Sequence, residues 1–333
     1  MKAPVAVVVV NYNRRELLRA CLESLFRQTL PPLEIIVVDN GSTDGSAEMA
    51  RELGARVVRS ERNLGFAGGN NRGCREASAP WLALLNNDAV ADPRWLAELM
   101  RAAAPEAGLV ACRVLRAERR DLLDNVGVRL WPDGMSRGAF HYRRDAETVA
   151  PEVFIPSGSA MLVKREAFMR AGGFDESFFA YSEDTDLSLK VRLLGYRCAL
   201  ADRAYVYHRG GGGTLGPMSP DKIYLVERNR LAILFRYLGA GSILLSPLYT
   251  AMRYGGLALA LMRSGRSARR AGSAPVGVGA GLRALGRAYR DYLPRLGSDL
   301  RLRAQWKHGR TLLQPCLQRR LDWQSLVRLE PDE

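Results

Sequence analysis

The sequence predicts an α/β fold with a largely parallel central sheet. Strand-like, polar and helix-like segments alternate four times in the first hundred residues, which is typical of such sheets. Val5–Val10 is a continuous apolar run, as expected of a strand covered on both faces. Polar clusters follow three of the four predicted strands: Asn11-Tyr12-Asn13, Asp39-Asn40 and Asn86-Asn87-Asp88. Ligands bind beyond the carboxyl ends of such strands, so we expect the clusters to meet in one crevice.

Each predicted element has a signal at its ends. Asn13 and Glu16 have the spacing of a capping box and predict a helix to about Gln28. Gly54 is placed to end the second helix, and the dipeptide Asp92-Pro93 predicts the start of the fourth. The predicted strands are Val5–Val10, Glu34–Val38, Arg56–Arg59 and Trp81–Leu85.

The second half of the chain is less regular. From Leu115 to Val149 the only clear signal is a turn at Trp131-Pro132-Asp133-Gly134. Beyond Lys222 the chain predicts helices rich in Arg, Ala and Leu. The segments expected between these regions are a strand over Val153–Val163, a helix over Arg165–Arg170, a loop over Phe174–Tyr181, a helix from Ser182 to Leu194, a strand over Ala204–Tyr207 and a flexible loop over Gly210–Gly213.

Composition excludes several classes of protein. Of the 333 residues, 47% are hydrophobic and 25% charged, which excludes disordered, collagen-like and disulfide-scaffold chains. The five cysteines are scattered without a C-x-x-C pair, so zinc and redox motifs have no support, and a reducing compartment is indicated. The run before Asn11 is too short for a signal peptide.

The net charge of +14 is concentrated at the C-terminal end. Residues 236–333 hold 17 Lys and Arg against 6 Asp and Glu. We therefore expect a domain over residues 1–237 and a basic helical region over residues 238–333, with an anionic partner for that region. The most apolar stretch, Ser242–Met262, is interrupted by Pro247 and Arg253 and does not predict a membrane span.

The region from Gly239 onward predicts peripheral association with an anionic membrane surface. Its apolar stretch Ile243–Leu261 is followed by Arg263, Arg266, Arg269 and Arg270, as in a basic amphipathic surface helix. A helical subdomain or a dimer interface is the alternative. Nucleic acid is not expected, because the aromatic residues that form stacking platforms are not interleaved with these arginines.

Two of the strand-end clusters contain an aspartate, and each aspartate suits a particular kind of ligand. Asp88 at the end of Asn86-Asn87-Asp88 suits Mg²⁺ or Mn²⁺, which bind hard oxygen ligands together with substrate phosphates. Asp39, ahead of a Gly-Ser-Thr loop, suits a ribose or a base edge. Ordinary turn chemistry is the alternative for both acids. The glycines of Asn63–Asn71 suggest close approach of a ligand to the backbone, with a tight turn as the alternative.

Asp184 and His208 are candidate site residues because of their positions in the predicted elements. Asp184 shares the apolar helical phase of Leu187 and Val191 and should face inward, whereas Asp186 should form an outward pair with Lys190. The helix dipole alone also accounts for acids at this position. His208 follows a predicted strand and precedes four glycines, so it is either a metal ligand or a structural histidine.

Taken together, these segments resemble family 2 glycosyltransferases with the GT-A fold, which has a Rossmann-like, mostly parallel central sheet flanked by helices. The resemblance runs from Val5 to about Tyr237 and is closest to the rhamnosyltransferase-like branch, which builds bacterial cell-wall and surface polysaccharides. It rests on the ordered segments VVVVNYNRRELLRACLESLFRQ, IIVVDNGSTDGS, NLGFAGGNNRG, LLNNDA, PSGSAMLVKREAFMRAGGFDESFFAYSEDTDLSLKVRLLGYR, YVYHRGGGGT and ERNRLAILFRYL.

The resemblance implies a role for each candidate residue. Asp184 would be the catalytic base, and Asp88 and His208 would bind the metal. Asn86 stands where the family has the first acid of its D-x-D motif, a variant familiar in this branch. Arg228 and Arg230 would add charge at the diphosphate. The residues implied to bind the donor nucleotide are Asn11, Asn13, Asp39, Asn63, Gly65, Asn70 and Asn87.

The implied reaction is inverting, metal-dependent transfer of a sugar from a nucleoside-diphosphate sugar, with dTDP-L-rhamnose favoured. The acceptor would be a hydroxyl of a glycan or polyprenyl-linked glycan, and the protein would act at the cytoplasmic face of the cell membrane. Assembly into a homo-oligomer is a further expectation. The alternatives are a galactofuranosyl- or other hexosyltransferase that uses a UDP-sugar, and a catalytically silent protein that binds nucleotide sugars.

Overall fold

A computed structural model describes residues 2–148, 152–210, 219–263 and 277–306, with Leu313, Cys316 and Leu317. The chain divides into two compact units. Unit 1 comprises Met1–Arg129 and Arg137–Gly210, and unit 2 comprises Leu130–Ser136 and Gly211–Glu333. Unit 2 thus includes helix α7 (Pro220–Tyr237), which the sequence analysis placed with the first domain.

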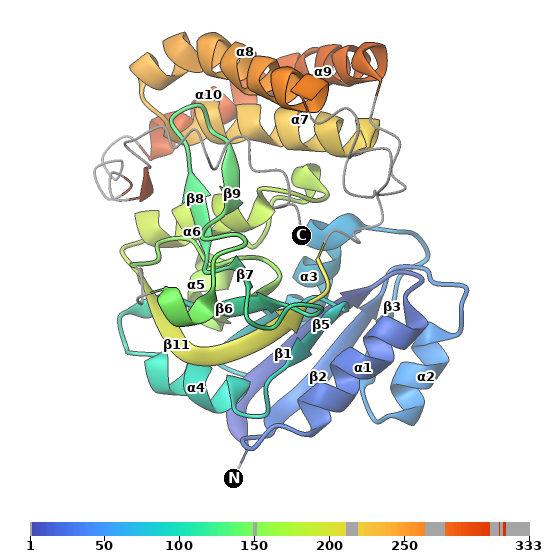
Figure 1. The fold of residues 1–333 in the computed structure, drawn as a ribbon. Helices are drawn as coiled ribbons and strands as arrows, with labels where there is room; N and C mark the ends of the chain where they lie inside the picture. The colour runs from blue at the N-terminus through green and yellow to red at the C-terminus, as the bar shows by residue number, and fades with distance from the viewer. Residues whose placement is uncertain are drawn as a thin grey trace. The chain divides into compact units, whose positions relative to one another are not determined.

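Unit 1 is built on one large sheet, parallel in its first half, as the sequence predicts, and mixed in its second half (Figure 1). Strands β3, β2, β1 and β4 are parallel neighbours in that order. Strand β10 is antiparallel to both β4 and β6. The strands of this sheet are β1 (Ala3–Asn11), β2 (Pro32–Asp39), β3 (Arg56–Arg59), β4 (Trp81–Leu85), β5 (Ala89–Ala91), β6 (Ala107–Arg116), β7 (Leu123–Asn125), β10 (Ala160–Lys164) and β11 (Arg197–His208).

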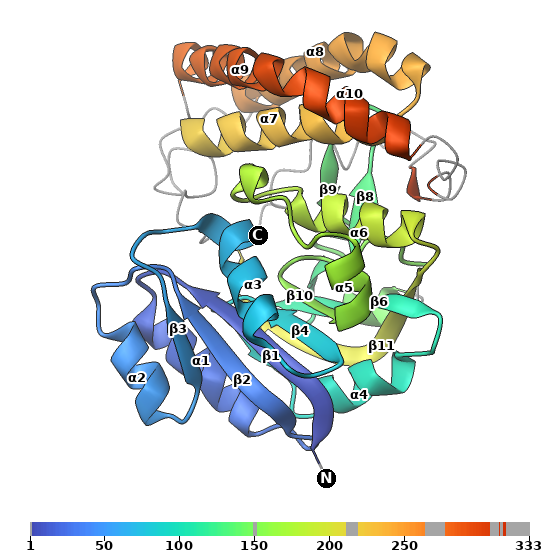
Figure 2. The same cartoon turned by 180° about the vertical axis from the view of Figure 1, so that it is seen from behind.

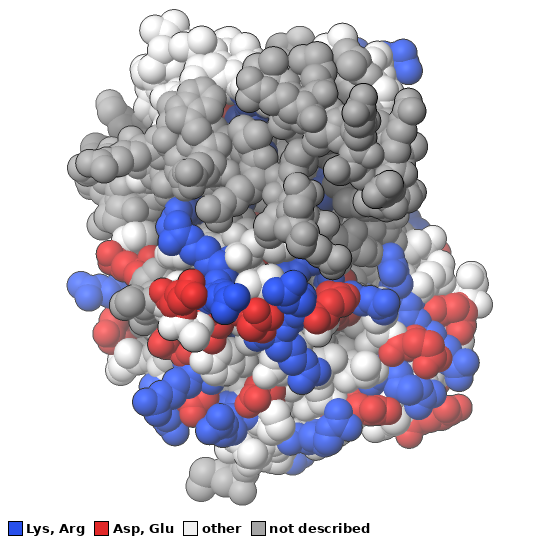
Figure 3. All heavy atoms as spheres, viewed as in Figure 1, with Lys and Arg blue, Asp and Glu red and all other residues white. Residues whose placement is uncertain are grey.

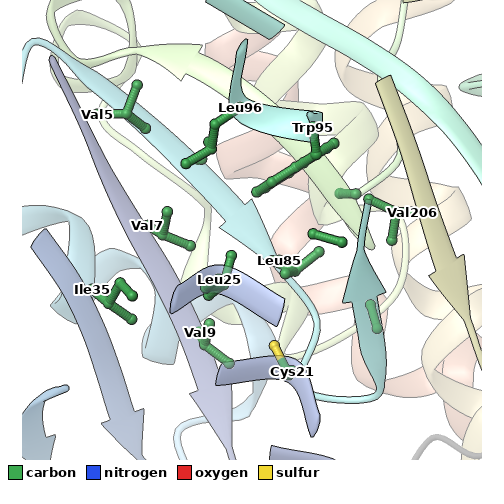
Figure 4. Close-up of a cluster of buried hydrophobic side chains, with 14 of the residues drawn as sticks. Val5, Val7, Val9, Cys21, Leu25, Ile35, Leu85, Trp95, Leu96 and Val206 are labelled. Atoms are coloured by element: carbon green, nitrogen blue, oxygen red, sulfur yellow. The ribbon is translucent and has the colours of Figure 1, made fainter. Parts of the chain in front are cut away.

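Helices cover both faces of this sheet (Figures 1 and 2). One face packs against α1 (Arg15–Phe26), α2 (Ser46–Glu52) and α4 (Trp95–Ala102). The other packs against α3 (Gly65–Glu76), α5 (Arg165–Arg170) and α6 (Glu183–Leu193). Because β1 lies between both layers, its alternating side chains are buried on both sides, and the cluster around Val5, Val7 and Val9 is shown in Figure 4.

Several local predictions are corrected by the structure. Asn13 does not cap α1: its φ is +50° and its Oδ1 accepts a hydrogen bond from the Thr43 N–H (2.8 Å). The glycine-rich segment is the first part of α3 itself rather than a turn before it. A Cβ added at Gly69 would come within 2.6 Å of Val10, so this glycine lets α3 pack closely on β1 instead of admitting a ligand.

The second half of the sheet was largely missed from the sequence. Strands β5, β6 and β7 were not predicted, β10 covers only the end of the expected Val153–Val163, and β11 starts at Arg197 rather than Ala204. In β6, the charged Arg113 interrupts an apolar run. Arg113 is buried and bonded to Asp145 and Asp202. A charged residue in this strand therefore does not indicate a solvent-exposed position.

Unit 2 is helical, as predicted for the C-terminal region. Its helices are α7 (Pro220–Tyr237), α8 (Ala240–Arg263), α9 (Val278–Tyr292) and α10 (Leu296–Gln305). The turn predicted at residues 131–134 joins β8 (Val128–Leu130) to β9 (Ser136–Gly138). The described part of the chain also contains the short 3₁₀ helices η1 (Asp145–Glu147), η2 (Glu176–Phe178) and η3 (Leu293–Arg295).

Two further expectations concern the later chain. The arginine expected at a diphosphate, Arg230, is instead fully buried within unit 2, where it donates to Glu227 Oε2 (2.8 Å) and to the Asp133 carbonyl (2.7 Å). Of the predicted Gly210–Gly213 loop, residues 211–213 lie outside the described residues. Across the described ranges, none of the helices has the length and apolarity to cross a membrane.

Candidate active site

The three predicted strand-end clusters meet at one edge of the sheet, as expected. The Asn87 side-chain amide after β4 donates to Asn11 Oδ1 at the end of β1 (2.7 Å). The Asn11 amide in turn donates to Ser42 Oγ in the loop after β2 (3.3 Å). These strands are parallel neighbours, so their carboxyl ends lie side by side.

Asp39 presents an unused acceptor at this edge. The residue is fully buried, and its Oδ2 accepts from the Ser42 N–H (3.3 Å) with Arg59 Nε 3.6 Å away. Its Oδ1 has no hydrogen-bond partner in the structure as described. A buried carboxylate oxygen without a partner is costly, so this atom suits a ligand that brings its own donor. Arg59, at the end of β3, was not singled out from the sequence.

Asn63 and Gly65 hold the start of α3 beside this loop. Asn63 Oδ1 accepts from the Gly65 N–H (2.9 Å) and from the Asn40 amide (3.3 Å). Gly65 has φ +71°, and a Cβ there would lie 2.5 Å from the Phe179 carbonyl oxygen. Only glycine fits this position, which ties α3 to the segment before α6.

Asn70 is the predicted pocket residue with the least support. It is buried, and its amide donates to the Phe66 carbonyl of its own helix (3.0 Å). Its neighbour Asn71 is more extensively bonded: it donates to the Phe174 carbonyl (2.8 Å) and accepts from the Phe174 N–H (2.9 Å). Asn71 therefore fastens the loop after α5 to α3.

Asp88 and His208 lie together, as the resemblance implies. Asp88 Oδ1 is 3.1 Å from His208 Nε2, and both side chains are largely buried. On its other side, His208 Nδ1 is 2.9 Å from Asp124 Oδ2. Asp124, on β7, was missed from the sequence, because 84 residues separate it from His208 and no local pattern marks it.

This cluster favours positive charge at His208. Burial opposes that charge, but hydrogen bonds to Asp124 and Asp88 outweigh it and raise the pKa of His208 to about 10. Burial likewise opposes ionisation of Asp88, and the bond and charge of His208 overcome it, so the pKa of Asp88 is lowered. The pKa of Asp124 is lowered for the same reasons, with His141 as its other partner.

The same residues fit a divalent cation. Asp88 Oδ1 and His208 Nε2 are a carboxylate oxygen and an imidazole nitrogen 3.1 Å apart, and both would be ligands of one ion once His208 gives up its proton. Asp124 would hold the ring of His208 by its other nitrogen, the usual support of a metal-bound histidine. No group of three or more His, Cys, Asp and Glu side chains in the described residues is arranged to hold a metal.

Asp184 has the opposite surroundings. Its Oδ2 accepts from the Gly158 N–H (2.9 Å) and its Oδ1 from the Thr185 N–H (2.7 Å). Burial raises the pKa of Asp184 even though these hydrogen bonds oppose the shift. Burial and then the charge of Asp184 raise the pKa of Glu183 well above its ordinary value. A carboxylate whose pKa is raised is suited to accept a proton.

A short segment links Asp184 to the strand end that carries Asp88. The Gly158 N–H bonds to Asp184, and the carbonyl of the next residue, Ser159, accepts from the Asn86 N–H (2.9 Å). Asn86 is two residues before Asp88, and its amide lies 3.3 Å from His208 Nε2. Asp184 is therefore connected to the strand end of Asp88 and His208 through two hydrogen bonds from backbone N–H groups and one peptide segment.

The helical phase argument used for Asp184 was wrong in part. Asp186, expected on the surface, is fully buried with its Oδ2 2.9 Å from Lys190 Nζ, and Glu183 is buried as well. Asp184 is partly exposed instead. Helix α6 is covered on most of its circumference, so apolar spacing does not identify an inward face.

Solved structures with the same fold are glycosyltransferases. Mannosyltransferase PcManGT from Pyrobaculum calidifontis, in complex with GDP-Man and Mn²⁺, has a TM-score of 0.51 at 21% identity over 95% of this chain and 88% of its own. S. aureus TarS has a TM-score of 0.55 at 19% identity over 95% of this chain and 54% of its own. Unit 1 thus has the predicted GT-A fold of glycosyltransferases.

The sequence pattern of glycosyl transferase family 2 matches residues 6–172, and the chain belongs to this family. An N-acetylglucosaminyl-diphospho-decaprenol L-rhamnosyltransferase of Mycobacterium tuberculosis is 29% identical over 62% of this chain and 76% of its own length. O-antigen biosynthesis protein RfbC of Myxococcus xanthus is 28% identical over 66% of this chain, which spans only 18% of that protein. The family match includes Asp39 and Asp88 but ends before Asp184 and His208.

Proposed function

We propose that this glycosyltransferase moves a sugar, with inversion, from a nucleoside-diphosphate sugar to a hydroxyl group of a glycan or lipid-linked glycan. The observation that carries the proposal is the link through Gly158 and Ser159. It joins Asp184, whose pKa is raised, to the strand end of Asp88, whose pKa is lowered. Inverting transfer requires both a base for the acceptor and positive charge at the leaving diphosphate.

Asp184 is the proposed base. Its two backbone hydrogen bonds fix the carboxylate, and its partial exposure leaves it accessible to an acceptor. The side chain takes the proton from the acceptor hydroxyl while that oxygen attacks the anomeric carbon. The bond from that carbon to the donor diphosphate breaks on the opposite face, which gives inversion.

Asp88 and His208 are the proposed ligands of Mg²⁺ or Mn²⁺, which supplies charge neutralisation at the departing diphosphate when bound. Asp124 holds the ring of His208 in place by its other nitrogen. Asn86 contributes an amide where the family has an acid, so one carboxylate and one imidazole take the place of two carboxylates. Donor phosphates and water would complete the coordination.

The nucleotide would lie along the ends of β1 and β2. The Oδ1 of buried Asp39 has no partner in the described structure and suits a hydrogen-bond donor of the base or ribose. The hydrogen-bonded side chains of Asn87, Asn11 and Ser42 hold one another in place at the same strand ends. Asn13, Asn63 and Gly65 shape the loops that border this pocket. We assign Asn70 to the support of α3, since its amide bonds within that helix.

The proposed donor is dTDP-L-rhamnose and the proposed setting bacterial cell-wall or surface-polysaccharide synthesis. The support is the similarity to an L-rhamnosyltransferase that acts on a decaprenol-linked sugar and to an O-antigen biosynthesis protein. An acceptor of that kind would require peripheral contact with the cytoplasmic face of the membrane. UDP-sugars are the alternative donors.

A donor screen tests the proposal. The full chain is incubated with Mn²⁺ and each of a panel of dTDP-, UDP- and GDP-sugars, and both the melting temperature and the release of nucleoside diphosphate are measured. We expect dTDP-L-rhamnose to raise the melting temperature and to be slowly hydrolysed, with both effects abolished by EDTA. Stabilisation by a UDP-sugar alone would show that the donor is a UDP-sugar and not dTDP-L-rhamnose. Binding of a donor without release of nucleoside diphosphate would favour a catalytically silent protein that binds nucleotide sugars. No response to any donor would contradict the proposal.

A further inference from the structure

Helix α8 exposes apolar residues and buries charged and polar ones, which is the reverse of an ordinary surface helix. Its side chains are described from Ala240 to Gly256, and the exposed ones in that range are all apolar. Leu244 is 80% exposed, Leu248 58% and Leu245 46%. The exposed positions of this range are Ala240, Gly241, Leu244, Leu245, Pro247, Leu248, Ala251 and Gly255.

The polar residues of α8 point into unit 2 instead. Arg253 is buried and forms ion pairs with Glu227 Oε1 (3.0 Å) and with Asp133. Ser246 is also buried, and its Oγ accepts from Arg230 Nη1 (2.9 Å). The buried ion pairs fix the orientation of α8, so the apolar face cannot turn inward by rotation of the helix without breaking them.

A second apolar stripe runs along α9 and into η3. Leu282 of α9 is 63% exposed, and Leu293, the first residue of η3, is 66% exposed. The two stand eleven residues apart, on one side of this continuous helical segment. Exposed arginines flank this stripe at Arg283, Arg287 and Arg290. Figures 1 and 2 show α8 and α9 on the same side of α7.

Charge distinguishes between the occupants that could cover this surface. Unit 2 holds 20 Lys and Arg against 9 Asp and Glu, a net charge of +11, whereas unit 1 is close to neutral at +3. A second copy would bring two units of +11 together, which like-charge repulsion opposes. In Figure 3 the described surface over α8 is mostly uncharged, and the exposed residues of α8 from Ala240 to Gly256 are apolar. Nucleic acid would contact the arginines of α9 but leave the leucines of α8 in water, whereas a lipid bilayer would contact both.

We infer that the exposed faces of α8 and α9 form a docking surface for an anionic lipid bilayer. The leucines of both helices insert among the acyl chains at the interface, and the arginines of α9 contact anionic headgroups. This inference rests on the membrane contact included in the proposed function and names the surface that makes it. The catalytic residues of unit 1 have no part in it.

Flotation with vesicles tests the inference. The full chain is mixed with phosphatidylcholine vesicles that contain either no or 30 mol% phosphatidylglycerol (about one lipid in three), at low and high salt. We expect binding to the anionic vesicles only, weakened by salt. The double substitution Leu244→Ser and Leu248→Ser should lower partitioning at least about tenfold, and Arg283→Gln about fivefold, the equivalent of about 1 kcal/mol.

Matched substitutions in unit 1 serve as controls. Leu33→Ser changes a leucine that is 44% exposed on β2, and Arg27→Gln changes an exposed arginine directly after α1, so neither should alter flotation. No wild-type binding, or equal binding of the leucine double variant, would overturn the inference. So would a wild-type dimer in sedimentation velocity that the double variant converts to monomer, since the occupant would then be a second copy.

Donor binding separates this inference from the proposed function. The melting temperature with Mn²⁺ and the nucleotide sugar, measured without vesicles, should be unchanged in the leucine double variant. A protein that binds donor but no vesicles would overturn only the docking surface. A protein that binds vesicles but no donor would contradict only the proposed transfer reaction.

Discussion

Asp88 and Asp184 are the two carboxylates of the proposed site, and their surroundings shift their pKa values in opposite directions. Asp88 lies 3.1 Å from His208, with Asp124 behind that ring, and its pKa is lowered. Burial raises the pKa of Asp184, although its hydrogen bonds from backbone N–H groups oppose the shift. Two carboxylates whose pKa values are shifted in opposite directions suit different roles. Asp88 stays charged and suits a cation, whereas Asp184 suits the acceptance of a proton.

The largest expected effect follows from removing the base. Asp184→Asn keeps the shape of the side chain but cannot accept the proton, so turnover should fall by roughly 10²–10⁴-fold while nucleotide affinity is nearly unchanged. Steady-state rates and calorimetric titration with the nucleotide would measure both. Glu166→Gln, an exposed acid on α5, is the control and should alter neither.

This control replaces the neighbouring acids that the sequence had suggested. Glu183 is buried beside Asp184 and Asp186 is bonded to Lys190, so changes at either would disturb the helix itself. Unchanged turnover in Asp184→Asn would remove it from the mechanism. A loss of nucleotide affinity as large as the loss of turnover would make its role structural.

The next effect concerns the other carboxylate. Asp88→Asn should reduce Mn²⁺-dependent nucleotide binding at least about 100-fold, because an amide is a far weaker ligand than a carboxylate. Titration with UDP or dTDP in the presence of Mn²⁺, repeated with EDTA, measures this. Asp121→Asn, an exposed acid, is the matched control. Binding that is equal with and without chelator in the wild type would contradict a metal at this site.

Asp124 extends the comparison to a residue that does not touch the ion. Asp124→Asn removes the charge that fixes the ring of His208, and metal affinity should fall about 10–100-fold. Electron paramagnetic resonance of free Mn²⁺ in the presence of nucleotide reports this directly, without turnover. An affinity that matches that of the wild type would show that Asp124 supports only the fold.

The strand ends of this site were predictable, because they depend on local sequence. An apolar run followed by a polar cluster defines β1, β2 and β4, and parallel pairing then brings Asn11, Asp39 and Asn87 to one edge. Predictions for β3 and α5 coincide with the observed Arg56–Arg59 and Arg165–Arg170. These elements are short segments whose signals lie within themselves.

The parts of the fold and of the candidate site that could not be predicted depend on contacts between residues far apart in the sequence. Asp124 has its role through His208, and the pair is formed only when β7 and β11 both align on β6. Buried charge misled the prediction twice more: Arg113 interrupts a buried strand, and Asp186 was assigned to the surface from its position on a helix that is covered on most sides. The pairs that neutralise these charges involve residues that the local pattern does not show.

A smaller effect is expected from pH. Asp184 acts as a base only when deprotonated, so activity falls as the pH falls through its raised pKa, and the acid limb should lie above the ordinary value of 3.8. The pH profile of kcat/KM measures the position of this limb. An acid limb at or below 3.8 would contradict the raised pKa of Asp184.

The most direct test of the central contrast is the titration of both carboxylates in one sample. Carbon-13 NMR of the metal-free protein labelled at aspartate carboxyl carbons, with Asp88→Asn and Asp184→Asn to assign the two signals, follows each group across the acid range. The account predicts that Asp88 titrates below the ordinary value of 3.8 and Asp184 above it. Equal pKa values, or the reverse order, would contradict the assignment of one carboxylate to the cation and the other to the proton.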